Sequence, residues 1–450
     1  MIYVITNELL ILPEDKFTVQ HDLNYLLQYW KDKDVIAVDT ETTTFRPWDG
    51  KLLTIQLGDS DNQFIINWQA VGEEFTEPIK KLLESKLLVF QNVKFDWQWL
   101  YHNGIDVRNI YDTFLGECIL TTGYSVRQLG LADISRKYTG IEVSKDDRGL
   151  INRVGLTERV LKYCAEDVAH LGEIRDKQLK KIEGFNLEKV LELECLVVRA
   201  LALMEYNGVL IDEKKWLEVA EEAERTIKST VEKLDVIVEE KAGFNDRLRK
   251  HLNLQTNLFG FEERKTKINW ASNKQKGIIL GELGYSVPDV ADKTLQKMKH
   301  KHKIFKELIT FSKHQKLATS FGKNFLKFVN KNTGRVHGEI WQILATGRLA
   351  MSKPNLQQIP AHGVLGEKIR SCFIARPGHV LVTTDVVGFE ARIVTEFSQD
   401  PLWLSIYNEG KDLHSEVCTK LFGIPLSDVK KPFPPKPDLT YRFVAKTIKC

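Results

Sequence analysis

Residues 35–68 read VIAVDTETTTFRPWDGKLLTIQLGDSDNQFIINW, and this stretch decides the fold of the first part of the chain. Short β-branched runs alternate in it with turn residues, at Asp49-Gly50 and at residues 59–62. This spacing predicts three antiparallel strands joined by turns. A further strand is predicted at residues 87–90, and it is followed by helical patterns at 96–102, 113–121 and 157–182. Strands followed by helices in this order predict an α/β domain over residues 1–186.

Composition bounds the class of protein. The chain has 450 residues, of which 43% are hydrophobic and 28% charged, so several apolar cores are expected. The net charge of +3 decides nothing about a polyanionic partner. The six cysteines never form a Cys-x-x-Cys pair, which disfavours a disulfide framework and a structural zinc site. The sequence shows neither a basic leader nor an apolar membrane span, so we expect a cytoplasmic protein that does not enter membranes.

The second part of the chain has a different pattern. Residues 187–331 are almost wholly helical in periodicity, with a long amphipathic helix predicted at 214–242. The second half of residues 187–331 carries eight closely spaced lysines: Lys293, Lys297, Lys299, Lys301, Lys303, Lys306, Lys313 and Lys316. Such a run suits binding to phosphates, and it equally suits a solvated helix face.

Strand patterns return near the end of the chain. They occur at residues 335–344 and 379–385, and the loop TGRLAMSKPNLQQIP separates them. The proline-rich segment KKPFPPKPD at 430–438 predicts a rigid loop before a last helix that starts near Leu439.

Four carboxylates and a tyrosine form a candidate catalytic set in the α/β domain. Asp39 and Glu41 are two apart on a predicted strand, so they share a face. Asp96 stands at a strand-to-helix junction, while Tyr163 and Asp167 are four apart on one helical face. Carboxylates suit a pair of Mg²⁺ ions, and a phenol can orient water for phosphodiester hydrolysis. Each piece alone is more often an ordinary surface feature, and it is their combination that points to a nuclease.

At these residues the sequence resembles the DEDD exonucleases of the tyrosine subclass. The resemblance covers about residues 30–185 and includes Gln91-Asn92 and YDTFLGECIL, whose Asp112 stands where the family also has an acid. It implies a ribonuclease H-like 3′→5′ exonuclease that degrades single-stranded DNA. By resemblance, Asp39, Glu41, Asp96 and Asp167 hold two Mg²⁺ ions, which Mn²⁺ can replace, and Tyr163 orients the attacking water.

Residues 334–360, GRVHGEIWQILATGRLAMSKPNLQQIP, resemble the palm of family A DNA polymerases. By this resemblance Arg348, Asn355 and Gln357 contact the primer-template. VTTDVVGFEARIVTEFSQDP at 382–401 resembles the first catalytic palm motif, in which Asp385 binds Mg²⁺ and Glu390 lies near the nucleotide sugar. The family carries polar or aromatic residues where this chain has Val386-Val387-Gly388. The resemblance therefore does not predict how finely this chain selects nucleotides.

The last fifty residues resemble the start of the polymerase fingers. His414 in DLHSEVCTKLFG, together with Arg442 and Lys446 in YRFVAKTIKC, implies binding of the dNTP triphosphate. In an unrelated helix the Arg-Lys pair is an ordinary solvated pair. The family's second palm aspartate, in a His-Asp-Glu motif, is not found in residues 1–450. We therefore expect a truncated, phage-type polymerase whose centre a second polypeptide completes, with splicing or no completion as open alternatives.

The expected architecture is an α/β multidomain protein. It comprises a ribonuclease H-like exonuclease domain (1–186), a helical thumb (187–333), and a partial palm (334–400) and partial fingers (401–450) of a right-hand polymerase. MEYNGVLID (204–212) and SNKQ (272–275) support the thumb by resemblance. Two other functions stay open: an exonuclease with only a DNA-clamping polymerase remnant, and a non-catalytic DNA-binding protein.

Overall fold

The computed structural model describes residues 1–143, 149–242, 246–256, 262–266, 268–360 and 363–449. These residues form two compact units, Met1–Pro377 and Gly378–Cys450.

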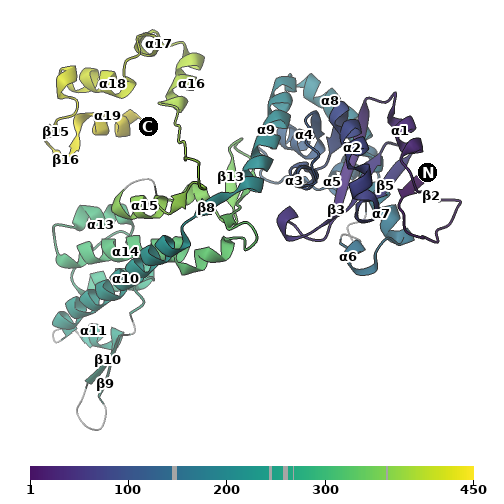
Figure 1. The fold of residues 1–450 in the computed structure, drawn as a ribbon. Helices are drawn as coiled ribbons and strands as arrows, with labels where there is room; N and C mark the ends of the chain where they lie inside the picture. The colour runs from purple at the N-terminus through teal and green to yellow at the C-terminus, as the bar shows by residue number, and fades with distance from the viewer. Residues whose placement is uncertain (144–148, 243–245, 257–261, 267, 361–362, 450) are drawn as a thin grey trace. The chain divides into compact units, whose positions relative to one another are not determined.

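A seven-stranded mixed sheet organises the start of the first unit, with the order β2-β1-β5-β4-β3-β6-β7 (Figure 1). β3 (Val35–Thr42), β4 (Leu52–Gly58) and β5 (Gln63–Asn67) pair antiparallel, which confirms the predicted turn-linked strands. β6 (Leu87–Phe90) and β7 (Ile110–Asp112) extend the sheet in parallel beyond β3. β1 (Ile2–Ile5) and β2 (Phe17–Gln20) complete the other edge, and the sequence analysis did not predict them.

Helices cover this sheet. They are α1 (Asn24–Trp30), α2 (Trp68–Ser85), α3 (Lys94–His102), α4 (Thr113–Leu120), α5 (Leu131–Thr139), α6 (Ile151–Val154), α7 (Glu158–Ala169) and α8 (Leu171–Gly184). The single helix predicted at 157–182 is thus two helices that meet at His170. Trp30, Phe64 and Trp99 are fully buried in the core between sheet and helices. The expected α/β domain is therefore present.

The core of this domain continues beyond residue 186. α9 (Glu188–Asn207) places Leu191, Cys195, Val198 and Ala202 in the same hydrophobic cluster as the sheet. Ile343, from a distant part of the chain, joins that cluster too. A boundary at residue 186 therefore divides one continuous core.

A helical module follows, and its predicted long helix is α10 (Glu213–Ala242). α10 lies beside α14 (Lys303–Phe321), and both contribute to a core with α11 (Asp246–His251), α12 (Asn273–Glu282) and α13 (Asp292–Met298) (Figure 1). The region is not wholly helical, because β9 (Leu252–Thr256) and β10 (Glu262–Thr266) form a hairpin. β8 (Val209–Ile211) also pairs with β11 (Arg335–Val336) and β14 (Phe373–Ile374).

The segment after the helical module is folded against the α/β domain. The strand pattern at 335–344 gives β11 and then β12 (Glu339–Trp341), which pairs with β13 (Ala350–Ser352). α15 (Gly363–Arg370) follows, packed against α10. Arg127 donates to the Ile343 carbonyl at 2.9 Å, and the Gly123 amide donates to Ala345 at 2.9 Å.

The second unit contains α16 (Phe389–Ser398), α17 (Pro401–Asn408), α18 (Leu413–Phe422) and α19 (Tyr441–Lys449). The strand predicted at 379–385 is wrong, because this extended segment pairs with no strand among the described residues. Its alternating pattern favours an extended conformation, but a β-strand also needs a neighbouring strand to pair with. The predicted proline-rich loop is also wrong, since β15 (Pro432–Phe433) and β16 (Lys436–Thr440) form a hairpin there.

Two sequence expectations concern features other than the sheet and helices. Cys118, Cys164, Cys195, Cys372 and Cys418 are buried and free, so the described residues contain no disulfide framework. Cys450 lies outside the described residues. Within the ranges given above, no helix combines the length with the apolarity needed to cross a bilayer.

Candidate metal centre

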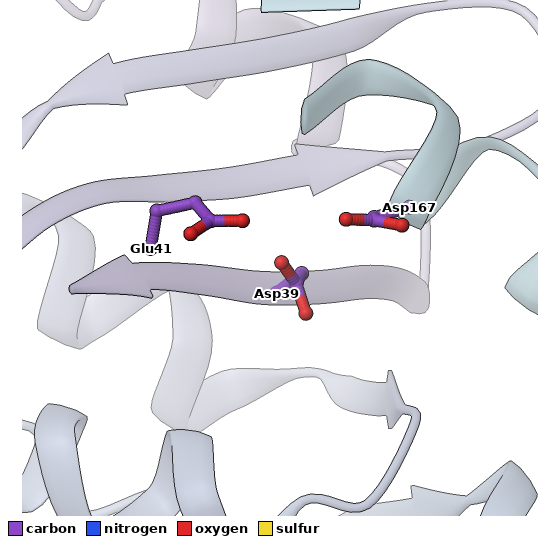
Figure 2. A group of neighbouring side chains, drawn as sticks. All are labelled: Asp39, Glu41 and Asp167. Atoms are coloured by element: carbon purple, nitrogen blue, oxygen red, sulfur yellow. The ribbon is translucent and has the colours of Figure 1, made fainter. Parts of the chain in front are cut away.

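Strand β3 and helix α7 bring three carboxylates together. Asp39 and Glu41 lie two apart on β3, and Asp167 lies on α7, which packs against this strand. Their ligand oxygens all lie within 4.8 Å of one another. Figure 2 shows the three side chains extending toward one another from the strand and the helix. The structure therefore brings together three of the four carboxylates singled out in the sequence.

Tyr163 completes the face that α7 presents to this cluster. The Thr157 hydroxyl caps the helix by accepting from the Val160 amide, which fixes where the helix starts. Tyr163 is 8% exposed and lies one turn before Asp167. Burial raises its pKa well above the usual value, and the charges of Asp167, Glu41 and Asp39 raise it further. The phenol therefore stays protonated beside the carboxylates and can donate a hydrogen bond.

Asp96 is placed differently from the other predicted ligands. It lies in the first turn of α3 and is 3% exposed, and its carboxylate accepts a 2.6 Å hydrogen bond from the Thr40 hydroxyl. Burial raises its pKa to about 8. Among the described residues, the group within 4.8 Å contains Asp39, Glu41 and Asp167 and does not include Asp96. The sequence analysis missed Thr40, which stands between the two acids of the Asp-Thr-Glu motif and holds Asp96 in place.

Asp112 has a structural role in this arrangement. Its carboxylate accepts from the amides of Asn92 and Val93 at 2.8 and 3.1 Å, and from Phe114 at 2.9 Å. It thereby caps α4 and fixes the turn before α3, in which Asn92 has φ of 65°. Burial raises the pKa of Asp112 to about 6. The acid thus supports the segment that carries Asp96.

The donor chemistry of the cluster fits a hard divalent cation. Its three side chains supply only carboxylate oxygens, the ligands that Mg²⁺ and Mn²⁺ prefer over the sulfur and nitrogen that zinc commonly takes. Asp39 and Glu41 are partly exposed, which leaves the cluster open to solvent and substrate. The cluster can therefore hold a metal ion next to a bound molecule.

The predicted DNA-contacting residues of the first unit are located on its surface. Arg348 is exposed in the turn between β12 and β13, where the Leu344 amide donates to its carbonyl. Asn355 accepts from the Gln357 amide at 3.0 Å and begins a short 3₁₀ turn. Lys301 and Lys303 are exposed near the junction of α13 and α14, and Lys299 is partly exposed there. Lys303 also pairs with Glu240 at 3.0 Å.

In the second unit, Asp385 and Glu390 are both exposed. Asp385 lies in the extended segment before α16, and Glu390 lies in the first turn of that helix. The expectation that Asp385 ends a strand is therefore wrong, for the reason given above. Its role as a metal ligand stays a prediction.

His414, Arg442 and Lys446 lie on neighbouring helices of the second unit. His414 is in the first turn of α18, and the other two are on α19, which packs against α18. Arg442 makes two bonds to Asp412, at 2.8 Å from Nε and 2.9 Å from Nη2. Asp412 also caps α18 by accepting from the Ser415 amide. The sequence analysis missed Asp412, although an Asp directly before a helical pattern is a cap signal.

Comparison with known proteins assigns a family to both parts of the chain. Residues 217–434 match the model described as DNA polymerase family A, and residues 15–183 match the model described as 3'-5' exonuclease. DNA polymerase I of Borreliella burgdorferi is 26% identical over 422 residues, which cover 90% of this chain and 44% of the relative. DNA polymerase I of Aquifex aeolicus is 26% identical over 439 residues, covering 92% of this chain and 68% of the relative.

A solved structure supports the fold. The POL domain of Pol1 from M. smegmatis, in complex with DNA primer-template and dNTP, aligns with a TM-score of 0.73 and 20% identity. The alignment covers 99% of this chain and 70% of that one. The chain spans less than half the length of several of the DNA polymerase I proteins it matches, such as 44% in Borreliella burgdorferi and 40% in Synechocystis.

Proposed function

We propose that this chain, whose residues 217–434 match DNA polymerase family A and whose residues 15–183 match the 3'-5' exonuclease model, serves in DNA-directed DNA synthesis and that its α/β domain proofreads the product. The observation that carries this proposal is the cluster of Asp39, Glu41 and Asp167, with oxygens within 4.8 Å, beside the protonated phenol of Tyr163. The substrate of the α/β domain is the 3′ end of a DNA strand.

The residues of the cluster divide the work of phosphodiester hydrolysis. Asp39, Glu41 and Asp167 would hold divalent metal, and Asp96, once ionised, would contribute a ligand to a second ion. Two Mg²⁺ ions held there would supply a hydroxide nucleophile and would stabilise charge on the attacked phosphate. Tyr163 donates its hydroxyl hydrogen bond within this site and orients the attacking water. Thr40 keeps the Asp96 carboxylate in place while the substrate binds.

The polymerase part takes primer-template DNA and dNTPs. Arg348, Asn355 and Gln357 contact the primer-template, and Asp385 is a palm ligand for Mg²⁺. Glu390 lies near the nucleotide sugar, while His414, Arg442 and Lys446 bind the triphosphate. The thumb lysines, Lys299, Lys301 and Lys303 among them, bind the DNA backbone. Completion of the centre by a second polypeptide and a cytoplasmic location stay predictions.

Metal-dependent release of nucleotides tests the proposal. The chain is incubated with a 3′-labelled single-stranded oligonucleotide and Mg²⁺ or Mn²⁺, and released mononucleotides are measured. Asp39→Ala removes a metal ligand, so release falls on the order of 10³-fold or more. Asp15→Ala removes an exposed carboxylate outside the cluster and serves as the matched control, with release unchanged.

The result that contradicts the exonuclease proposal is full activity of Asp39→Ala. A wild-type chain that binds DNA but releases no nucleotide with either metal favours the non-catalytic DNA-binding alternative instead. Tyr163→Phe keeps the ring and loses the hydroxyl, so it shows a smaller loss of release than Asp39→Ala.

A further inference from the structure

The three carboxylates come from two elements, so their geometry depends on how closely α7 approaches the sheet. Asp39 and Glu41 are fixed to β3, whereas Asp167 is fixed to α7. Any displacement of α7 away from the sheet separates Asp167 from its two partners. β4 pairs with β3, and it contacts α7, as do β3 itself and β5.

Three residues of β4 that differ in size lie opposite residues of β3 on one face of the sheet. In the antiparallel register, Glu41 is opposite Thr54, Asp39 is opposite Gln56, and Ala37 is opposite Gly58. Because residues two apart on a strand share a face, Thr54, Gln56 and Gly58 lie on the same face as the two acids. The pair with the smallest side chains on this face is Ala37 and Gly58. It lies next to the pair of Asp39 and Gln56.

Gly58 makes the closest approach to α7. A Cβ atom at this position would lie 2.6 Å from Val168 Cγ2 and 3.1 Å from Val168 Cβ. Carbon atoms in contact are ordinarily about 3.5–4.0 Å apart, so even one methyl group does not fit. Val168 is fully buried and is the residue directly after Asp167. The glycine thus permits contact between the sheet and the turn of helix that bears the metal ligand.

Gln56 is a buried polar side chain on the same face of β4, opposite Asp39. Its Nε2 donates to the Thr54 hydroxyl at 2.8 Å. Its Oε1 is buried and accepts no hydrogen bond from any described residue. The short contact between this face and α7 is therefore the apolar one at Gly58.

We propose that Gly58 is a positioning residue of the metal centre, because its missing side chain lets Val168 seat α7 closely enough for Asp167 to meet Asp39 and Glu41. The inference rests on the proposed exonuclease function and adds the element that sets the ligand spacing. Metal–ligand distances in a well-formed site lie within about 0.2 Å of their standard values. A Cβ at residue 58 lies 2.6 Å from Val168 Cγ2, so either Val168 with its helix or the strand must shift to accommodate it.

Gly58→Ala tests this positioning, with direct metal binding as the main readout. Mn²⁺ affinity is measured by electron paramagnetic resonance, alongside the Mg²⁺ concentration that gives half-maximal nucleotide release. We expect the affinity to fall on the order of 10-fold to 100-fold, as for other residues that orient metal ligands. Gly172→Ala is the matched control, because a Cβ there meets nothing within 4 Å, and its affinity is expected to equal that of the wild type.

A second substitution distinguishes displacement of α7 from general loss of folding. Val168→Ala removes the Cγ2 atom that collides at 2.6 Å and leaves the Cβ contact at 3.1 Å. Gly58→Ala/Val168→Ala is therefore expected to regain most of the Mn²⁺ affinity that Gly58→Ala loses. A general packing defect gives the opposite result, since the truncation of Val168 adds its own destabilisation to the overpacking by Gly58→Ala.

The inference is overturned if Gly58→Ala binds Mn²⁺ as tightly as the wild type, or if the double variant binds it no better than Gly58→Ala. Neither outcome tests the exonuclease function, which fails if Asp39→Ala keeps its activity or if the wild-type chain releases no nucleotide with either metal. Conversely, a fully active Asp39→Ala with weak Mn²⁺ binding in Gly58→Ala contradicts the function and leaves the geometric inference standing.

Discussion

Glu205 joins the α/β domain to the segment that precedes Arg348. This side chain is 4% exposed on α9 and accepts from Lys94 at 2.5 Å and from Gln98 at 2.9 Å. It also accepts from the backbone amide of Ile340, whose carbonyl accepts from Lys94. Lys94 is on α3, two residues before Asp96. One buried ion pair thus fixes the position of α3 relative to β12.

Replacement of Lys94 is predicted to destabilise the protein strongly. Lys94→Met leaves Glu205 as a buried charge without its cation, which costs about 3–5 kcal/mol of unfolding free energy. Urea unfolding measures this loss. Lys177→Met is the matched control, because Lys177 and Glu173 pair on the surface with 45% and 48% exposure, and the expected loss there is below about 1 kcal/mol. Equal effects from the two substitutions would contradict the buried role of Lys94.

His337 is predicted to make stability depend on pH. It is 7% exposed, stacks on Trp48 at 3.9 Å and donates from Nδ1 to the Glu205 carbonyl. Burial lowers its pKa below 6.5, and Arg46 and Arg335 lower it further, whereas the hydrogen bond to the Glu205 carbonyl and the charge of Asp49 raise it. The unfolded chain therefore binds a proton at a pH where the folded chain does not.

Because the pKa of His337 is lowered by folding, this residue destabilises the folded protein as the pH falls. As the pH falls below about 6.5, protonation of His337 in the unfolded chain favours unfolding, and this stops once the folded form also takes up the proton. His337 should thus make the free energy of unfolding fall between pH 7.5 and pH 5, against the raised pKa values of Asp96 and Asp112, whose contributions have the opposite sign. In His337→Gln the fall over this window is smaller, and an identical pH profile in both proteins would rule His337 out as its source.

The sequence alone predicts which side chains share a face where their spacing along one strand or helix decides it. Asp39 with Glu41 on a strand, and Tyr163 with Asp167 on a helix, share faces because of strand and helix periodicity. Thr40 and Asp412 were missed because their partners, Asp96 and Arg442, are 56 and 30 residues away in sequence. Only the packing of whole elements brings such pairs together.

At the scale of elements, periodicity predicted the amphipathic helix α10 and the antiparallel strands β3, β4 and β5. It failed for the extended segment 379–385 and for the hairpin of β15 and β16. A segment forms a strand only when another strand pairs with it, and the β-propensity of its residues does not reveal whether one does. Proline at residue 432 is compatible with a short edge strand, which a loop interpretation overlooks.

The lysines near the junction of α13 and α14 are predicted to carry much of the salt dependence of DNA binding. Replacing Lys299, Lys301 and Lys303 by alanine should reduce the log-log salt slope on duplex DNA by about 0.9 for each phosphate that the variant no longer neutralises. Lys180, Lys181 and Lys189 are exposed on α8 and α9 and give a matched triple control. Fluorescence anisotropy at several salt concentrations measures the slopes, and equal slopes for both triples would show the first set to be a solvated face.

At the scale of the whole molecule, the sequence predicted the order of the parts better than their boundaries. Motifs mark where each part is, whereas boundaries depend on which side chains share a core. Residues 1–186 were expected to form one domain, but α9 and Ile343 contribute to that core. The compact division of the chain falls instead after Pro377.

This division predicts the behaviour of two fragments. Residues 1–377 contain Asp39, Glu41, Asp96 and Asp167, and neither core cluster of the α/β domain includes a residue beyond Ile343. This fragment should therefore release nucleotides from single-stranded DNA at the rate of the whole chain, within about twofold, a barrier difference of roughly 0.4 kcal/mol. Residues 1–186 lack Leu191, Cys195, Val198 and Ala202 of α9, and also Glu205, the partner of Lys94.

The shorter fragment should be much less stable, because fully burying each large apolar side chain contributes about 1.5–3 kcal/mol and several are missing. Thermal unfolding and nucleotide release, measured on both fragments and the whole chain, test this difference. Residues 1–207, which restore α9, are the matched intermediate and should recover part of the lost stability. If residues 1–186 unfold at the same temperature as residues 1–377, then α9 is an appendage of the α/β domain rather than part of its core.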